Sequence, residues 1–170
     1  MTNQNKDKCR RVNRKEQGVI EYETVRIEKT ENVCPMCEDY AKKRVSKQVA
    51  VMCCEGACLR GEIARQAANI ICYLLIPEKT VRICLGGAFT KDTGQRNLVR
   101  NAKKVIAIEG CFIKCSSRMM NGVISKLNPE VIIADKLYDF DRNLFGIDEM
   151  PEDGIKAHAR EVARKIAEKL

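Results

Sequence analysis

Aromatic side chains are scarce in this 170-residue chain, which has no tryptophan and only four phenylalanines and four tyrosines. Proteins that bind single-stranded nucleic acid stack the bases on aromatic side chains, and this sequence offers no such platform. The formal net charge of +8 would attract a polyanion, but only a clustered basic patch indicates nucleic acid. We therefore interpret the charge as a solvated basic surface and expect no nucleic-acid partner.

Long apolar segments are also absent from the sequence. No run approaches the roughly 18 apolar residues that a transmembrane helix requires. Residues 1–17 are polar and charged, which predicts a solvated arm, and they lack the apolar region of a secretory signal. We therefore expect a cytoplasmic protein that does not engage a membrane.

Histidine is nearly absent, whereas cysteine is abundant. His158 is the only histidine, and its place beside the apolar stripe of a predicted C-terminal helix predicts a structural role. The chain has ten cysteines, which in a cytoplasmic protein indicate metal or redox chemistry and not a disulfide framework. Two of them, Cys53 and Cys72, fall at apolar positions of a strand and a helix, so we predict that they belong to the core.

Two kinds of apolar segment alternate along most of the chain. Short β-branched segments predict buried strands, and longer segments with apolar residues at helical spacing predict helices. The predicted strands span 48–53, 80–87, 104–110 and 130–135, and the predicted helices span 59–75, 90–103, 114–127 and 151–170. This alternation predicts a three-layer α/β domain with a mainly parallel four-stranded sheet in the Rossmann-like or flavodoxin-like order 2-1-3-4. We expect residues 47–170 to form this domain and residues 1–46 to be an N-terminal extension with another strand at 19–29.

The most informative feature is a pair of similar turns, each carrying two cysteines four positions apart. Cys54 and Cys58 follow the first predicted strand of the domain, and Cys111 and Cys115 follow the third. These strand ends flank the point where the strand order reverses, which is where open α/β sheets bind their ligands. Cys84, near the end of the neighbouring strand, would bring a fifth thiol to the same edge. The sequence therefore predicts that several thiols converge there.

Thiols at the start of a helix are suited to metal binding. The unpaired N–H groups and the positive end of the helix dipole stabilise a thiolate over a thiol. Four thiolates around one Zn²⁺ carry a net charge near −2, which two helix N-termini would partly offset. The pattern therefore predicts a zinc-binding protein that handles or senses metal. Four thiolates also suit an iron–sulfur cluster, so the native metal stays open.

The same turns resemble those of the DGC-domain family, whose proposed ligand is zinc. The resemblance covers about residues 48–140 and rests on a first cysteine turn, a glycine after it and a second cysteine turn, which here are Cys54-Glu-Gly56, Gly61 and Gly110-Cys111-x-x-x-Cys115. It implies four cysteine ligands, namely Cys54, Cys111 and Cys115 with Cys84 or Cys58 as the fourth. The aspartate that gives the family its name is Glu109 here, so the carboxylate is retained on a longer side chain.

A further pair of cysteines, Cys34 and Cys37, lies in a Cys-Pro-Met-Cys turn ahead of the predicted domain. This spacing occurs in metal sites and in thioredoxin-like redox motifs. Because the topology that follows is flavodoxin-like and not thioredoxin-like, we interpret the pair as a second metal half-site or as two extra ligands folded over the main site. Two thiols this close could also close into a disulfide.

One enzymatic alternative stays open from the sequence. The spacing Cys54-x5-Arg60 resembles the phosphate loop of low-molecular-weight tyrosine phosphatases and related arsenate reductases. In that case Cys54 would be the nucleophile, Arg60 would bind the oxyanion, and Asp135 or Asp139 would be the general acid. The remaining thiols of the two turns have no role in phosphate chemistry, whereas arsenate reduction would use them. We therefore prefer metal binding without catalysis, with the protein partner left open.

Overall fold

The computed structural model describes residues 21–170, so the charged arm predicted at 1–17, with Cys9, lies outside the described residues. The described chain contains four strands, β1 (Val49–Cys53), β2 (Thr80–Arg82), β3 (Lys104–Glu109) and β4 (Glu130–Ile133). Its α-helices are α1 (Pro35–Arg44), α2 (Leu59–Ile70), α3 (Leu85–Thr90), α4 (Gly94–Asn101), α5 (Cys115–Val123) and α6 (Glu152–Ala167). A π-helix, η1 (Ile71–Leu75), and two 3-10 helices, η2 (Ala134–Lys136) and η3 (Ile147–Glu149), complete the elements.

All four strands are parallel and follow the order β2-β1-β3-β4. Val49 at the start of β1 pairs with Thr80 of β2 and with Lys104 of β3, so the three strands begin at the same level. The predicted α/β fold and strand order are confirmed. The order reverses between β1 and β3, and their carboxyl ends therefore lie next to each other at the position where such sheets bind ligands.

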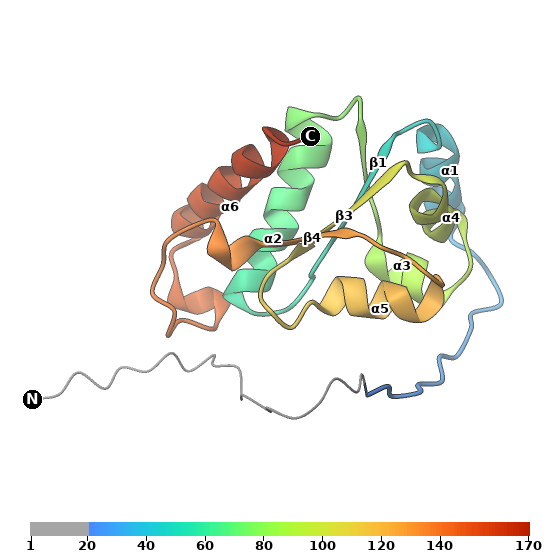
Figure 1. The fold of residues 1–170 in the computed structure, drawn as a ribbon, viewed down its shortest axis with the longest axis horizontal. Coiled ribbons are helices and arrows are strands. Elements are labelled where there is room, and N and C mark those ends of the chain that lie inside the picture. The colour runs from blue at the N-terminus through green and yellow to red at the C-terminus, as the bar shows by residue number, and fades with distance from the viewer. Residues whose placement is uncertain (1–20) are drawn as a thin grey trace, which may run out of the picture.

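Helices cover both faces of the sheet, which gives the three layers seen in Figure 1. Along β1, Val49, Val51 and Cys53 point into a core shared with α2 and α6. The alternate residues, Ala50 and Met52, point into a second core on the opposite face, which α1, α3, α4 and α5 cover. Every residue of β1 is therefore buried, as expected for a central parallel strand. Cys53 and Cys72 both lie in the first core, as the sequence predicted.

Several sequence predictions differ from the structure, among them the helix predicted at 114–127, which ends at Val123, and the strand predicted at 130–135, which ends at Ile133. The strand predicted at 19–29 is wrong over its described part, because residues 21–29 form no regular element. Tyr22 and Val25 are 87% and 60% exposed, so the alternating pattern has no apolar layer to pack against. The strand predicted at 80–87 ends early, because α3 begins at Leu85. The helix predicted at 90–103 is shorter and begins only at Gly94.

The N-terminal segment is attached to the sheet through α1, which lies beside α4 (Figure 1). Ala41 of α1 is buried in the second core. The Glu38 carboxylate accepts a hydrogen bond of 2.9 Å from the backbone N–H of Gly94, and so caps the start of α4. The Cys-Pro-Met-Cys turn is thereby held against the α/β layers. Among residues 21–170, no helix has the length and apolar character needed to cross a membrane.

Two glycines allow the cysteine turns to touch through their backbones. A Cβ atom on Gly61 would lie 2.6 Å from the carbonyl oxygen of Gly56, in the first turn. A Cβ atom on Gly110, in the second turn, would lie 2.8 Å from the carbonyl oxygen of Arg60. Both distances are far below van der Waals contact, so no other residue fits without a backbone shift. The N-terminus of α2 therefore lies wedged between the two turns.

We predict that Gly61→Ala lowers the free energy of unfolding by about 1–3 kcal/mol, because the new methyl group overpacks this backbone contact. Gly122→Ala in α5 is the matched control, since outside its own helix backbone and chain neighbours no atom of the described residues lies within 4 Å of the added methyl group. That change should gain up to about 1 kcal/mol from the higher helix propensity of alanine. Denaturant unfolding monitored by circular dichroism measures both. Equal stability of the two variants would contradict the tight backbone packing of the N-terminus of α2 between the two turns.

Candidate metal centre

The first cysteine turn is an extension of β1. The Cys54 backbone N–H donates a 2.9 Å hydrogen bond to the carbonyl oxygen of Ile108, which prolongs the pairing with β3 by one residue. Cys54 is consequently buried. Cys58 is the N-cap residue of α2, and it forms a β-bridge with Gly146 of the loop that precedes α6. The two thiols of this turn are therefore fixed by different neighbours, the sheet and the loop.

Packing around Gly56 brings the thiols of the first turn to one side. A Cβ atom on Gly56 would lie 3.4 Å from the Sγ of Cys54 and 3.7 Å from the Sγ of Cys58. Both sulfurs thus border the same small space, which exists because residue 56 has no side chain. A Cβ atom at this position would be in van der Waals contact with both thiols.

The second turn places its thiols against the first. Partial burial of the Cys115 thiol raises its pKa to about 11, with further contributions from Cys54, Glu109 and Cys111 and from a hydrogen bond with Cys54. These influences act over short distances, so Cys54, Cys111 and Cys115 share one environment. Metal-free Cys115 is therefore a protonated thiol at neutral pH. Yet no three histidine, cysteine or acidic side chains among residues 21–170 form a ready-made metal-binding group.

Glu109 anchors the helix that carries Cys115. Its side chain is fully buried at the end of β3. The carboxylate accepts hydrogen bonds from the backbone N–H groups of Ser116 (3.2 Å) and Ser117 (2.7 Å). It also accepts one from each serine hydroxyl, at 2.8 and 2.7 Å. The negative charge therefore caps the N-terminus of α5, where helix geometry favours an anion.

This anchoring role was not predicted from the sequence, which pointed to Glu109 only as a replaced aspartate. The available signal was a carboxylate at a strand end, followed by two adjacent serines in the first turn of a helix. Those serines supply both backbone and hydroxyl donors.

A family model for the DGC domain matches residues 50–167. The chain belongs to the DGC-domain family. The match runs from β1 to the end of α6, and so extends beyond the residues 48–140 over which the motifs resemble the family. Comparison of the sequence with curated proteins and with solved structures gives no significant match. The glycines that let the turns of this DGC domain touch, Gly61 and Gly110, belong to the motifs that carried the resemblance.

Arg60 has a structural role in the DGC domain. Its guanidinium is buried and donates hydrogen bonds to the carbonyl oxygens of Leu144 (3.0 Å) and Arg142 (2.9 Å). Its Nε lies 3.5 Å from a carboxylate oxygen of Asp135, and the guanidinium stacks over Phe140. The side chain thus ties α2 to the loop before α6. The anion-binding role considered for Arg60, and the enzymatic alternative with it, find no support in this arrangement.

Cys84 lies in a different neighbourhood, together with the Cys-Pro-Met-Cys turn. It is the N-cap residue of α3, and its backbone N–H donates a 3.0 Å hydrogen bond to the side chain of Gln95. The charge of Cys84 contributes to raising the pKa of Cys37, although burial of Cys37 is the larger cause. Cys37 and Cys84 also line one cavity of about 300 Å³, together with Tyr40 and Tyr73. Seven candidate cysteines therefore fall into two groups, with Cys84 beside α1.

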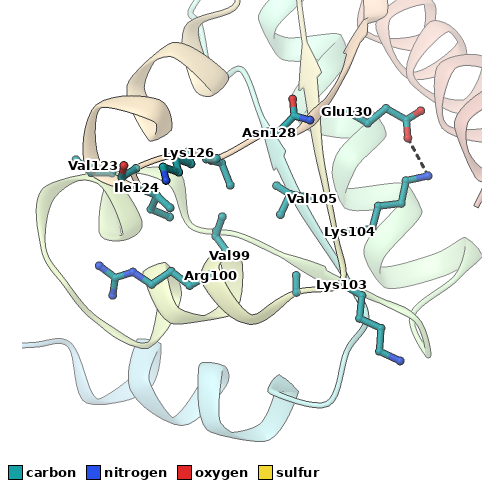
Figure 2. A pocket seen from close by; sticks show the side chains of 13 residues that line it. Val99, Arg100, Lys103, Lys104, Val105, Val123, Ile124, Lys126, Asn128 and Glu130 are labelled. Carbon is teal, nitrogen blue, oxygen red and sulfur yellow. Dashed lines mark ion pairs between the residues drawn. The ribbon is translucent and has the colours of Figure 1, made fainter.

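A larger cavity of about 650 Å³ lies at the opposite edge of the sheet, where β3 and β4 begin (Figure 2). Its wall includes Arg100, Lys103 and Lys126, and Lys104 is paired there with Glu130 at 2.8 Å. No cysteine lines it. It belongs to the amino ends of the strands and is not part of the thiol site.

We predict that Glu109→Gln lowers the free energy of unfolding by about 1–3 kcal/mol, because the amide NH₂ cannot accept from buried N–H and hydroxyl groups. Glu130→Gln is the matched control. Its exposed ion pair with Lys104 contributes about 0–1 kcal/mol. Denaturant titration of both variants gives the comparison. Similar losses for the two would show that Glu109 is not an anchor.

Proposed function

We propose that this DGC domain binds a thiophilic metal ion, with zinc as the first choice, through Cys54, Cys58, Cys111 and Cys115. The single observation that carries the proposal is the contact between Cys54 and Cys115, which joins thiols from two separate turns. Thiolates from paired turns are the usual ligands of closed, tetrahedral zinc sites. Binding would displace the thiol protons and draw the four sulfurs around a common centre.

The surroundings of these thiols suit a negatively charged metal–thiolate group. α2 and α5 both begin at the site, with Cys58 as the N-cap residue of one and Cys115 as the first residue of the other. Their N-terminal N–H groups and dipoles offset part of the net charge near −2 of a four-thiolate zinc site. A reducing compartment such as the cytoplasm keeps such thiols available for the metal.

Cys58 is our choice for the fourth ligand over Cys84. The Cys58 sulfur borders the same space beside Gly56 as the sulfur of Cys54. The interactions of Cys84 are instead with Cys37 and Gln95. The proposed role is metal handling or sensing, in which the protein exchanges its ion and performs no turnover. An iron–sulfur cluster on the same ligands would make the purified protein brown, whereas the zinc protein is colourless.

We predict that anaerobically purified protein carries about one zinc ion per chain in this site. Cys111→Ser and Cys115→Ser should remove most of that zinc, because each deletes a ligand. Cys72→Ser should retain it, because Cys72 is buried in the core on α2's side of the sheet. Elemental analysis combined with a thiol count measures the stoichiometry. Equal zinc content in all three variants would refute the assignment.

The fourth ligand is tested by a second pair of variants. We expect Cys58→Ser to lower the zinc content, and to speed its removal by a chelator, more than Cys84→Ser does. Both residues are N-cap cysteines with no side-chain cap hydrogen bond, so the comparison is matched for local structure. A larger loss in Cys84→Ser would transfer the fourth position to Cys84.

A further inference from the structure

Cys34 and Cys37 occupy the first turn of a helix. Cys34 is the N-cap residue of α1, Pro35 is the first helical residue, and Cys37 follows one turn along. The Cys34 carbonyl oxygen accepts the first helical hydrogen bond, of 3.1 Å, from the N–H of Glu38. Cys34 is exposed and Cys37 is half-buried. One thiol of the pair therefore faces solvent, and the other lies behind it.

The two thiols are in contact and differ in character. Hydrogen bonds from the backbone and the thiol of Cys37 lower the pKa of Cys34. Burial, followed by the interaction with Cys34, raises the pKa of Cys37. A cysteine at the start of a helix gains further thiolate character from the helix dipole. A substrate from solution therefore reaches the exposed Cys34 at the helix start first, and the less exposed Cys37 lies one turn along to react second.

The surface around the pair suits a substrate that approaches from solution. Met36, between the two cysteines, is 81% exposed, and Tyr73 of η1 is 50% exposed. Both line the cavity of about 300 Å³ that also contains Cys37 and Cys84. Cys37 thus opens onto a cavity with exposed apolar and aromatic walls, and Cys34, which does not line that cavity, is exposed beside it at the start of α1.

We propose that Cys34 and Cys37 form a redox-active dithiol that exchanges with disulfides, separate from the metal centre. The Cys34 thiolate attacks one sulfur of a substrate disulfide R–S–S–R, whose S–S bond breaks and releases RS⁻, which takes a proton from solvent. Cys37 then loses its proton and attacks the Cys34 sulfur, and the second RS⁻ leaves and is protonated. The protein loses two electrons as its dithiol becomes a disulfide, and the substrate gains them as two thiols.

The first test uses the full chain and glutathione disulfide as the substrate. After incubation, quenching and peptide mapping by mass spectrometry, we expect a disulfide between Cys34 and Cys37. Cys37→Ser should lose that disulfide completely and accumulate glutathione on Cys34, because the second step is blocked. Cys72→Ser, altered in the core, should behave like the wild type. Before oxidation, iodoacetamide should modify Cys34 faster than Cys84. Cys84 is also an exposed N-cap cysteine, but no second cysteine follows it three residues later.

The second test asks which kind of disulfide is the substrate, and it also checks whether the two cysteines bind a metal ion instead. Reaction with glutathione disulfide but not with insulin would identify a low-molecular-weight substrate, and the reverse would identify a protein disulfide. The proposal is overturned if neither substrate oxidises the pair, or if Cys34 and Cys84 are alkylated equally fast. It is also overturned if the isolated protein carries a second zinc ion that Cys34→Ser removes. Because zinc in the main site is measured separately with Cys115→Ser, failure of either proposal is distinguishable from failure of the other.

Discussion

The backbone contact at the start of α2 is the constraint on which the rest of the site depends. Gly61 lies against Gly56 of the first turn, and Gly110 of the second turn lies against Arg60. Without side chains at these positions, the ends of β1 and β3 approach closely enough for Cys54 and Cys115 to interact. Parallel pairing alone sets neighbouring strands about 4.8 Å apart, but it does not determine how the following turns fold. The absence of side chains at Gly61 and Gly110 lets the two turns pack backbone against backbone.

A charged side chain is held in place at the start of each of the two helices beside this contact, namely Glu109 at α5 and Arg60 at α2. The Glu109 carboxylate accepts hydrogen bonds from the backbone N–H groups of Ser116 and Ser117, in the first turn of α5. Cys115 is the first residue of the same turn. The guanidinium of Arg60 is held by the carbonyl oxygens of Leu144 and Arg142 and lies 3.5 Å from a carboxylate oxygen of Asp135. These partners already occupy the Arg60 guanidinium, so it is not left open to bind an oxyanion.

The sequence predicted the sheet well, because buried parallel strands and amphipathic helices have different periods that short-range patterns reveal. The order of the strands followed from the alternation of strands and helices, with a reversal of direction after the first connection, and it placed the two cysteine turns side by side. Other features depend on contacts distant in sequence and left no local pattern. The β-branched residues at 21–29 resemble a strand, yet no sheet edge receives them. Arg60 had the spacing of an anion-binding residue, but its partners lie more than eighty residues away. The place of Cys84 depends on α1, whose docking beside α4 no periodicity predicts.

The cysteines of this protein differ in their surroundings, and these surroundings shift the thiol pKa by different amounts and in different directions. Burial raises the pKa of Cys53 to about 12, and that thiol lies against the guanidinium of Arg82 within the core. The pKa of Cys115 is raised less than that of Cys53. Cys115 lies beside other thiols at the sheet edge, where a metal ion could replace its proton. The pKa of Cys34, at the exposed start of α1, is lowered by hydrogen bonds from Cys37. One sheet edge and one attached helix thus give chemically identical side chains the different surroundings on which the proposed metal-binding and redox roles rest. Burial and helix position make those surroundings differ, so an abundance of cysteine does not by itself imply a single site.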